Sequence, residues 1–344
     1  MRLYILFATL TIPVVAFGQV AFVSPNSAAY DPIYDRYYVA EAGSPWGIRN
    51  IVGGNSTSWV GTAFLPRDLL VKGDSLFCVH ASGGLIAWRF PSTAASINVN
   101  VGFGQDLWGL TTNGPWLYAT DRNDQSIWKI NAMNGSSTFL SLSLGWEPCG
   151  IVYDPVNDRL LVGAWGTNAG IHAIDLNTGE DTLLLQTTYT NIHGITIDCL
   201  GRILISTWFP DQVVAYPADL TGPGTVLFSG LDNPGFIHFD NYHGELMIPN
   251  TQSGLLSFEP INCSTDIPSY TRPTFGLEPN PASDHIRVHL PGKGTLCIMD
   301  GSGRRILETV VSDAGSVNVS TLPEGLYFVR IGSWSTPLVI SRNP

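Results

Sequence analysis

The sequence predicts an all-β protein: a six-bladed β-propeller closed by an N-terminal strand and followed by a small C-terminal β-sandwich. Three observations support this prediction. A motif of four short strands recurs six times, its period is close to 40 residues, and 36 glycines with only 13% charged residues are typical of a turn-rich globular chain. One four-stranded sheet cannot bury both faces alone, so the copies are expected to stack around an axis.

The clearest copy occupies residues 150–186. The apolar runs GIVYD and RLLVGA are joined by DPVND, whose Asp, Pro and Asn residues favour a tight reversal. The runs IHAID and DTLLLQ follow, joined by LNTGE, which suits a hairpin with positive φ angles. This segment therefore reads as one antiparallel sheet of four strands.

The other copies are located by the residue that opens the first strand of each sheet. Successive anchors are separated by 41, 41, 41, 44 and 41 residues, and they are Ser27, Asp68, Gly109, Gly150, Gly194 and Gly235. Six anchors predict six blades.

The last copy is incomplete, which indicates how the ring closes. It supplies GFIHFD, GELMIP and GLLSFEP and then breaks into INCSTDIPSYTRP, so its fourth strand is missing. A spare strand, QVAFVS, precedes the first copy at Gln19 to Ser24. We expect it to pair with the third strand of the sixth blade and to remove an exposed edge.

The N-terminus has the features of a secretory signal peptide. Arg2 precedes the apolar run LYILFATLTIPVVAF, and the small residues Ala16 and Gly18 flank Phe17 before the expected cleavage site. The run is short for a membrane span, and no other segment is apolar enough to be one. We predict a signal peptide at 1–18, a propeller at 19–260, a linker at 261–276 and a second domain at 277–344.

Charge and cysteine content limit the classes of partner. Between residues 19 and 276 the chain carries 22 acidic and 10 basic side chains, a surface that repels nucleic acid and favours cations. The five cysteines lack CxxC spacing, so structural zinc is not indicated. Disulfides are compatible with export, but the pairing stays open, and Cys149 is interpreted as a buried thiol.

The tail contains three ordered motifs: PNPASD at Pro279 to Asp284, a D-x-x-G-R turn at Asp300 to Arg304, and an L-x-x-G-x-Y-x-V strand at Leu322 to Val329. In this it resembles the C-terminal sorting domain of type IX secretion cargo. The resemblance implies recognition by the type IX machinery, passage through the periplasm to the outer cell surface or beyond, and removal of this domain. A generic terminal sandwich for carbohydrate or protein contact is the alternative.

The repeats, such as WGLTTNGPWLYATDRNDQSIWKI, resemble NHL and gluconolactonase-like propellers. The resemblance implies the fold rather than an activity. The resemblance also implies a candidate cofactor, a divalent cation such as calcium, because enzymes of the gluconolactonase type hold such a metal at the centre of the propeller.

Loops that lead into the inner strands gather at one end of a propeller, so residues at a fixed offset meet in space. Five of the six residues three positions before the anchors carry a side-chain oxygen, and the metal candidates are Asp106, Glu147, Asn191 and Asp232. Such oxygens suit a hard cation, but the same residue types also make the turns that launch strands.

His193, one position before its anchor, is the best candidate for an acid–base or ligating side chain, with Glu147 as the second catalytic candidate. A structural histidine at a strand start is the competing interpretation. Trp108, Trp165 and Trp208 are predicted near the same mouth, where with Asn191 they form a platform for a carbohydrate or protein ligand. Packing between blades is the alternative role for these indoles.

Two functions remain open from sequence alone. The first is an exported binding or interaction module with its ligand at the axial mouth. The second is a metal-dependent hydrolase or lyase of gluconolactonase-like type that uses the same residues.

Overall fold

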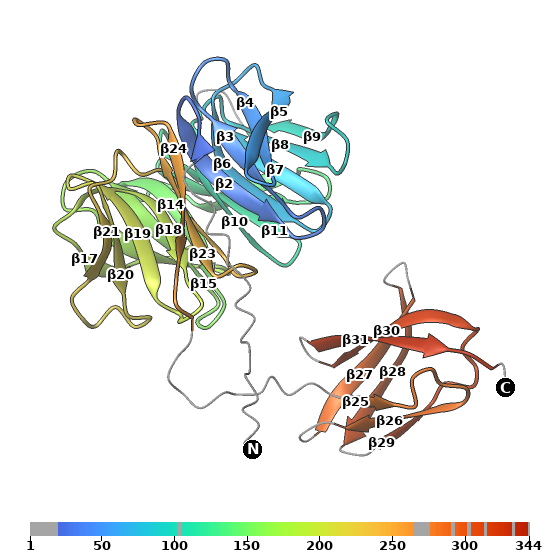
Figure 1. Ribbon diagram of the computed structural model, residues 1–344. Helices are drawn as coiled ribbons and strands as arrows, with labels where there is room; N and C mark the ends of the chain where they lie inside the picture. Colours follow the sequence, from blue (N-terminus) through green and yellow to red (C-terminus); the bar gives the residue numbers. More distant parts are fainter. Residues whose placement is uncertain are drawn as a thin grey trace, which may run out of the picture. The chain divides into compact units, whose positions relative to one another are not determined.

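The computed structural model describes residues 20–101, 105–263, 276–289, 293–300, 304–312, 315–331 and 334–342. The predicted signal peptide and Gln19 lie outside these residues. The chain divides after Cys263 into two compact units (Figure 1).

The first unit consists of six four-stranded antiparallel sheets, which confirms the predicted six-bladed propeller. The first three blades are β2 (Pro25–Asp31), β3 (Arg36–Glu41), β4 (Gly47–Val52) and β5 (Asn55–Gly61); β6 (Pro66–Lys72), β7 (Ser75–His80), β8 (Gly84–Arg89) and β9 (Ala95–Asn100); and β10 (Leu107–Asn113), β11 (Trp116–Asp121), β12 (Ser126–Asn131) and β13 (Ser137–Ser141). The next two are β14 (Glu147–Asp154), β15 (Arg159–Trp165), β16 (Gly170–Asp175) and β17 (Asp181–Gln186); and β18 (Thr190–Ile197), β19 (Ile203–Trp208), β20 (Gln212–Tyr216) and β21 (Thr225–Ser229).

The sixth blade joins the two ends of the propeller sequence. It contains β22 (His238–Asp240), β23 (Glu245–Asn250) and β24 (Leu255–Pro260), and its fourth strand is β1 (Val20–Ala21), which pairs antiparallel with β24. The predicted clasp is therefore confirmed. On the inner side, the Phe236 amide donates to the Asn26 carbonyl at 2.9 Å, so the sixth blade also meets the first.

Glycines let the inner strands approach closely around the axis. A Cβ at Gly150 would lie 2.7 Å from the His193 carbonyl oxygen, and one at Gly235 would lie 2.4 Å from the Asn26 carbonyl oxygen. The anchors of blades one and two carry side chains instead: the Ser27 hydroxyl donates to Asp68 at 2.6 Å. The other Asp68 oxygen accepts from the Leu110 amide of blade three at 2.9 Å. Hydrogen bonds of the Asp68 side chain thus join blades one, two and three at the axis.

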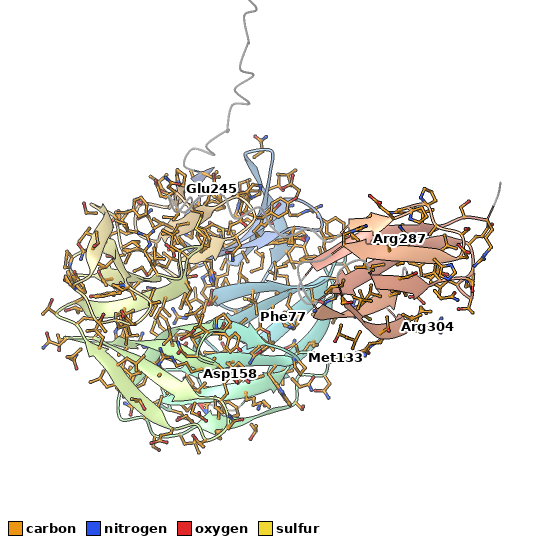
Figure 2. All side chains as sticks on the ribbon, turned by 90° about the horizontal axis from the view of Figure 1, so that it is seen from below. Phe77, Met133, Asp158, Glu245, Arg287 and Arg304 are labelled. Atoms are coloured by element: carbon orange, nitrogen blue, oxygen red, sulfur yellow. A yellow bond between two sulfur atoms is a disulfide. The ribbon has the colours of Figure 1, made fainter. Side chains whose placement is uncertain are left out.

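Apolar side chains fill the space between neighbouring blades. Tyr118 and Ile127 of the third blade pack with Leu160 and Val162 of the fourth, and all four are buried. Phe77 of the second blade is likewise buried, whereas Met133, in the turn between β12 and β13, is 83% exposed. Both side chains are labelled in Figure 2. The propeller core is therefore a ring of inter-blade layers.

The second unit is a β-sandwich of two sheets. One contains β25 (Gly276–Glu278), β26 (His285–His289) and β29 (Gly315–Asn318); the other contains β27 (Lys293–Met299), β28 (Arg305–Ser312), β30 (Gly325–Ile331) and β31 (Trp334–Ile340). Along β26, Ile286 and Val288 face the core, while Arg287 faces outward (Figure 2). This alternation gives the small domain its own apolar core.

The cysteine pairing, open from sequence, is Cys199–Cys263. It joins the turn between β18 and β19 to the chain segment that follows β24. Cys78 and Cys149 are free and buried, which agrees with the interpretation of Cys149 as a buried thiol.

Candidate functional site

The axial mouth is the end of the propeller channel where the inner strands begin. Asp106 immediately precedes β10, Trp108 lies on that strand, and Glu147 opens β14. The Trp108 indole N–H donates to Asp106 at 2.7 Å, which fixes both side chains. These three residues therefore lie where their inner strands begin, at one end of the ring.

Two arginines occupy the centre of the mouth. The Arg67 guanidinium lies 3.8 Å from the Trp108 ring centroid, and that of Arg122 lies 4.3 Å from the centroids of both Trp108 and Trp165. Arg67 pairs with Asp106 at 3.4 Å, and Arg122 binds the Glu147 carboxylate through Nε at 3.1 Å and through Nη2. Cation–π contacts and ion pairs therefore hold the mouth together.

Each of the four residues predicted as metal ligands has a partner within the protein. Asp106 and Glu147 are paired with arginines, and the Asn191 side-chain oxygen accepts from the Gly166 amide at 2.9 Å while Asn191 itself has a φ of 54°. Asp232 lines a separate groove with Asn250, whose side-chain oxygen accepts from the Asp232 amide. In the part of the chain that the structure describes, no three His, Cys, Asp or Glu side chains are grouped to hold a metal ion. A donor set whose carboxylates are neutralised by guanidinium groups does not fit a divalent cation.

Aromatic side chains from four blades meet beneath the arginines. We call Trp108, Trp165, His193, Trp208 and Phe236 the axial aromatic cluster. The Trp165 and Trp208 centroids are 4.9 Å apart in an edge-on arrangement, and the His193 ring lies 4.5 to 5.6 Å from the other four rings. Trp108 is buried, whereas Trp165 and Trp208 are half-buried. The cluster is therefore exposed only in part, through Trp165 and Trp208.

His193 lies at the axis but not on the surface. Only 2% of the residue is exposed, and neither ring nitrogen has a hydrogen-bond partner in the described part of the chain. Burial, together with the charges of Arg67 and Arg122, lowers the pKa of His193 to about 3. The imidazole is therefore neutral in the folded protein near neutral pH. Because the surrounding rings enclose it, a substrate could contact it and exchange a proton only if the indoles moved.

This pKa predicts a pH dependence of stability. The unfolded chain binds a proton at His193 near pH 6.5, whereas the folded chain does so only near pH 3. Stability should therefore fall as the pH drops through 6.5, by up to about 1.4 kcal/mol per pH unit for this one group. A His193→Phe variant should lose less stability between pH 7 and pH 5 than the wild type.

Urea unfolding followed by tryptophan fluorescence measures this difference, and His285→Ala in the second unit is the matched control because His285 is exposed. Identical pH slopes for His193→Phe and wild type would contradict the assignment of a neutral buried imidazole.

No role for Arg67 or Arg122 was predicted from the sequence. A signal for Arg67 existed, since it occupies the position one residue before its anchor, as Trp108 and His193 do. Arg122 lies in the loop that follows the second strand of blade three, beside the predicted mouth. The acidic residues predicted at this end of the ring indicated a cation, and Arg67 and Arg122 supply it as guanidinium groups.

A match to a known family lies in the C-terminal tail. Residues 278–340 match the secretion system C-terminal sorting domain family. The resemblance stated from the three motifs is thereby confirmed, and it implies that type IX secretion handles this chain and exports it to the cell surface or the extracellular space. A search among characterised protein sequences found no match. Within the described residues, no helix is long and apolar enough to cross a membrane.

Solved structures similar to the chain share the propeller fold. A gluconolactonase from Xanthomonas campestris aligns with a TM-score of 0.59 at 12% identity, covering 71% of this chain and 88% of that one. Virginiamycin B lyase from Staphylococcus aureus aligns with a TM-score of 0.53 at 14% identity and the same coverage. A chain of a nidogen–laminin complex gives 0.54 at 15%, covering 66% and 93%. Enzymes and an interaction protein thus share this architecture, so the likeness defines the fold alone.

Proposed function

We propose that the propeller is an exported binding module whose ligand sits on the axial mouth. The observation that supports this most directly is that the polar side chains of the mouth are already paired or buried. Arg122 is held between two indoles and bound to Glu147, and His193 is enclosed below, so the mouth offers a rigid recognition surface rather than an uncommitted acid or base.

A carbohydrate suits this surface. The half-buried rings of Trp165 and Trp208 offer flat apolar area, and the Arg122–Glu147 pair, in which Glu147 is 43% exposed, offers both donors and acceptors for neighbouring hydroxyl groups. After removal of the predicted signal peptide and sorting domain, the propeller would display this mouth outside the cell or on its surface.

The test is binding of the full chain to an array of neutral and acidic oligosaccharides, followed by titration of the best binder. A Trp165→Ala/Trp208→Ala double variant should bind at least about tenfold more weakly, because stacking area at a binding hot spot is lost. Val156→Ser is the matched control, since Val156 is 88% exposed in the turn between β14 and β15, at the opposite end of the inner strands. Unchanged binding by the double variant, or capture of peptides instead of oligosaccharides, would contradict the proposal.

The rival is a metal-dependent hydrolase or lyase with Glu147 or His193 as base. It draws support from the fold of the similar structures only. Stoichiometric calcium or zinc in the purified protein, lost in Glu147→Ala and His193→Ala variants, would favour the rival over the binding module.

A further inference from the structure

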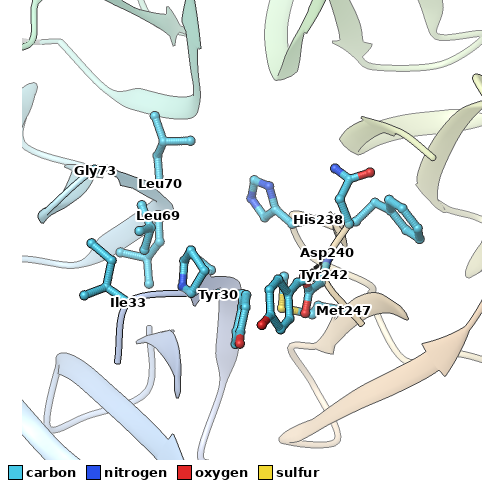
Figure 3. A pocket seen from close by; sticks show the side chains of 14 residues that line it. Tyr30, Ile33, Leu69, Leu70, Gly73, His238, Asp240, Tyr242 and Met247 are labelled. Carbon is cyan, nitrogen blue, oxygen red and sulfur yellow. Dashed lines mark hydrogen bonds between the residues drawn. The ribbon is translucent and has the colours of Figure 1, made fainter. Parts of the chain in front are cut away.

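A second cavity opens at the end of the channel opposite to the axial mouth. It has a volume of about 570 Å³ and is lined by the last residues of three inner strands, β2, β6 and β22, and by the turns that follow them (Figure 3). These strands belong to blades one, two and six. This is the side of the ring where Ser27 and Asp68 replace the anchor glycines.

The walls of the cavity are largely apolar. Leu69, Leu70, Ile33 and Met247 line it, and Figure 3 shows them around the opening together with Tyr30 and Tyr242. The two tyrosine rings have centroids 5.6 Å apart, and Tyr242 is 73% exposed at the rim. An apolar cavity of this size with an aromatic rim suits a flat ring of one or two cycles.

His238 contributes a polar group to this lining, and its Nε2 atom faces the carboxylate of Asp68. Its Nε2 lies 2.7 Å from the Asp68 carboxylate, whose side chain is only 2% exposed. The same carboxylate accepts from the Ser27 hydroxyl and from the Leu69 and Leu110 amides. A carboxylate surrounded by donors acts as an acceptor, so Nε2 must carry the proton.

The other ring nitrogen, Nδ1, is left for a ligand, and our proposal takes the neutral form of the ring. In a neutral imidazole with a proton on Nε2, Nδ1 holds the lone pair and accepts a hydrogen bond. The His238 side chain is 22% exposed and lines the cavity, so a ligand can reach it. A hydroxyl donor is the matching ligand group.

The charges around the cavity disfavour an anion. No lysine or arginine is among the described residues that line it, and the Asp240 carboxylate lies in its wall, where it accepts from the Tyr37 hydroxyl at 3.1 Å. Asp35 lies 2.8 Å from the Tyr30 hydroxyl at the rim. The described lining residues therefore offer an anion no lysine or arginine to pair with, whereas a neutral ligand needs none.

We propose that this cavity binds a neutral aromatic molecule with one hydroxyl donor, whose ring packs against Leu70 and the two tyrosines while its hydroxyl donates to Nδ1 of His238. The site is independent of the axial mouth, because its residues lie at the opposite ends of the inner strands.

The test compares two probes that differ in the donor alone, 2-naphthol and 2-methoxynaphthalene, titrated against the full chain by ligand-observed NMR. The wild type should bind the naphthol about fivefold more tightly, the factor that one neutral hydrogen bond supplies. His238→Phe keeps a ring of similar size but lacks the acceptor, so it should bind both probes equally.

Tyr242→Ala, an exposed change at the rim, should weaken both probes, and the Trp165→Ala/Trp208→Ala variant should leave both unchanged. Equal affinity of the two probes for the wild type, absence of saturable binding, or an unchanged affinity of Tyr242→Ala would overturn the proposal. The probe comparison on wild-type protein needs no substitution, so it decides the matter even if His238→Phe does not fold.

Discussion

Replacing Asp68 with asparagine should lower the free energy of unfolding of the propeller by about 3 kcal/mol, because a buried donor then faces another donor. One Asp68 oxygen accepts from the Ser27 hydroxyl, the Leu69 amide and His238, and the other accepts from the Leu110 amide at 2.9 Å. An asparagine NH₂ can replace neither oxygen without meeting an N–H group. These bonds tie blades one, two, three and six together, so their loss should be felt across the ring.

Urea unfolding monitored by tryptophan fluorescence measures the effect, since nine of the ten tryptophans lie in the propeller sequence. Asp35→Asn is the matched control: Asp35 is exposed and accepts from the Tyr30 hydroxyl, so this change should cost less than about 0.5 kcal/mol. A similar midpoint for both variants would mean that Asp68 is not the hub of the inner strands.

The blade number and the ring closure could be predicted from sequence because both rest on local signals. Each strand pair is bounded by turn residues, and the spacing of 41 residues follows from four strands and their connections. The missing fourth strand after GLLSFEP left one free edge, and QVAFVS was the remaining strand that could cover it. The structure confirms this strand pairing and adds its register, with Val20 opposite Leu256.

The candidate site was only partly predictable. The offset from a strand start places Asp106 and Glu147 at the mouth, because that distance is set within one blade. The cation that neutralises these two carboxylates comes from a neighbouring blade, so it depends on how the blades are arranged. Arg67 contacts Asp106 of the next blade, and Arg122 contacts Glu147 of the next blade. A metal and a guanidinium leave the same signature of acidic residues in the sequence.

The burial depth of a side chain and its contacts with distant blades could not be predicted from the sequence. His193 occupies a position that sequence reasoning assigns to the mouth, yet Trp165 and Trp208 pack against its ring. The His238–Asp68 contact joins blades six and two past blade one, over a separation of 170 residues. No spacing rule within a repeat can encode a contact that skips a blade.

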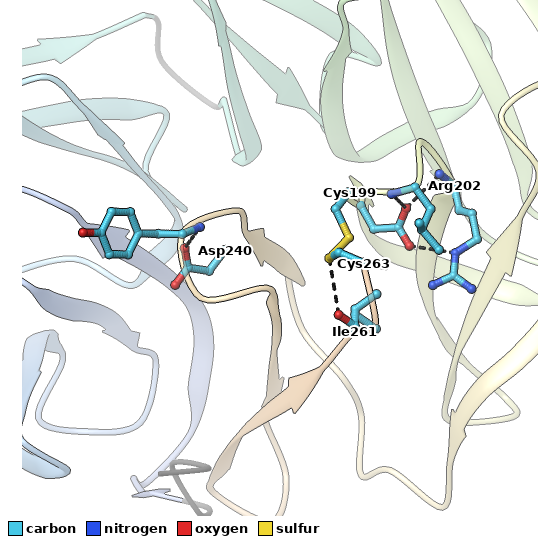
Figure 4. The surroundings of a disulfide bond; sticks show 8 residues. Cys199, Arg202, Asp240, Ile261 and Cys263 are labelled. Carbon is cyan, nitrogen blue, oxygen red and sulfur yellow. Dashed lines mark hydrogen bonds and ion pairs between the residues drawn. A yellow bond between two sulfur atoms is a disulfide. The ribbon is translucent and has the colours of Figure 1, made fainter. Parts of the chain in front are cut away.

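The disulfide should supply the second large contribution to stability. The Cys199→Ser/Cys263→Ser variant should lower the free energy of unfolding by about 2–4 kcal/mol. The cross-link joins two residues that are 64 positions apart in the sequence, so it restricts the unfolded chain. The bond also holds the end of the propeller sequence, where Ile261 lies beside Cys263 (Figure 4). The Ile261 amide donates to the Gly244 carbonyl at 2.9 Å. On the other side, buried Asp198 accepts from the Arg202 side chain at 2.7 Å and fixes the turn that carries Cys199.

Unfolding midpoints under non-reducing conditions test this, with Cys297→Ser in the second unit as the control. Reduction of the wild type should reproduce the loss seen in the double variant, whereas the double variant should not respond to reductant, since the remaining propeller cysteines, Cys78 and Cys149, are free and buried. Because blade six has only the two-residue β1 as its described outer strand, the bond is expected to matter most for the last blade. Equal midpoints for the double variant and the wild type would show that packing of β24 alone keeps the ring closed.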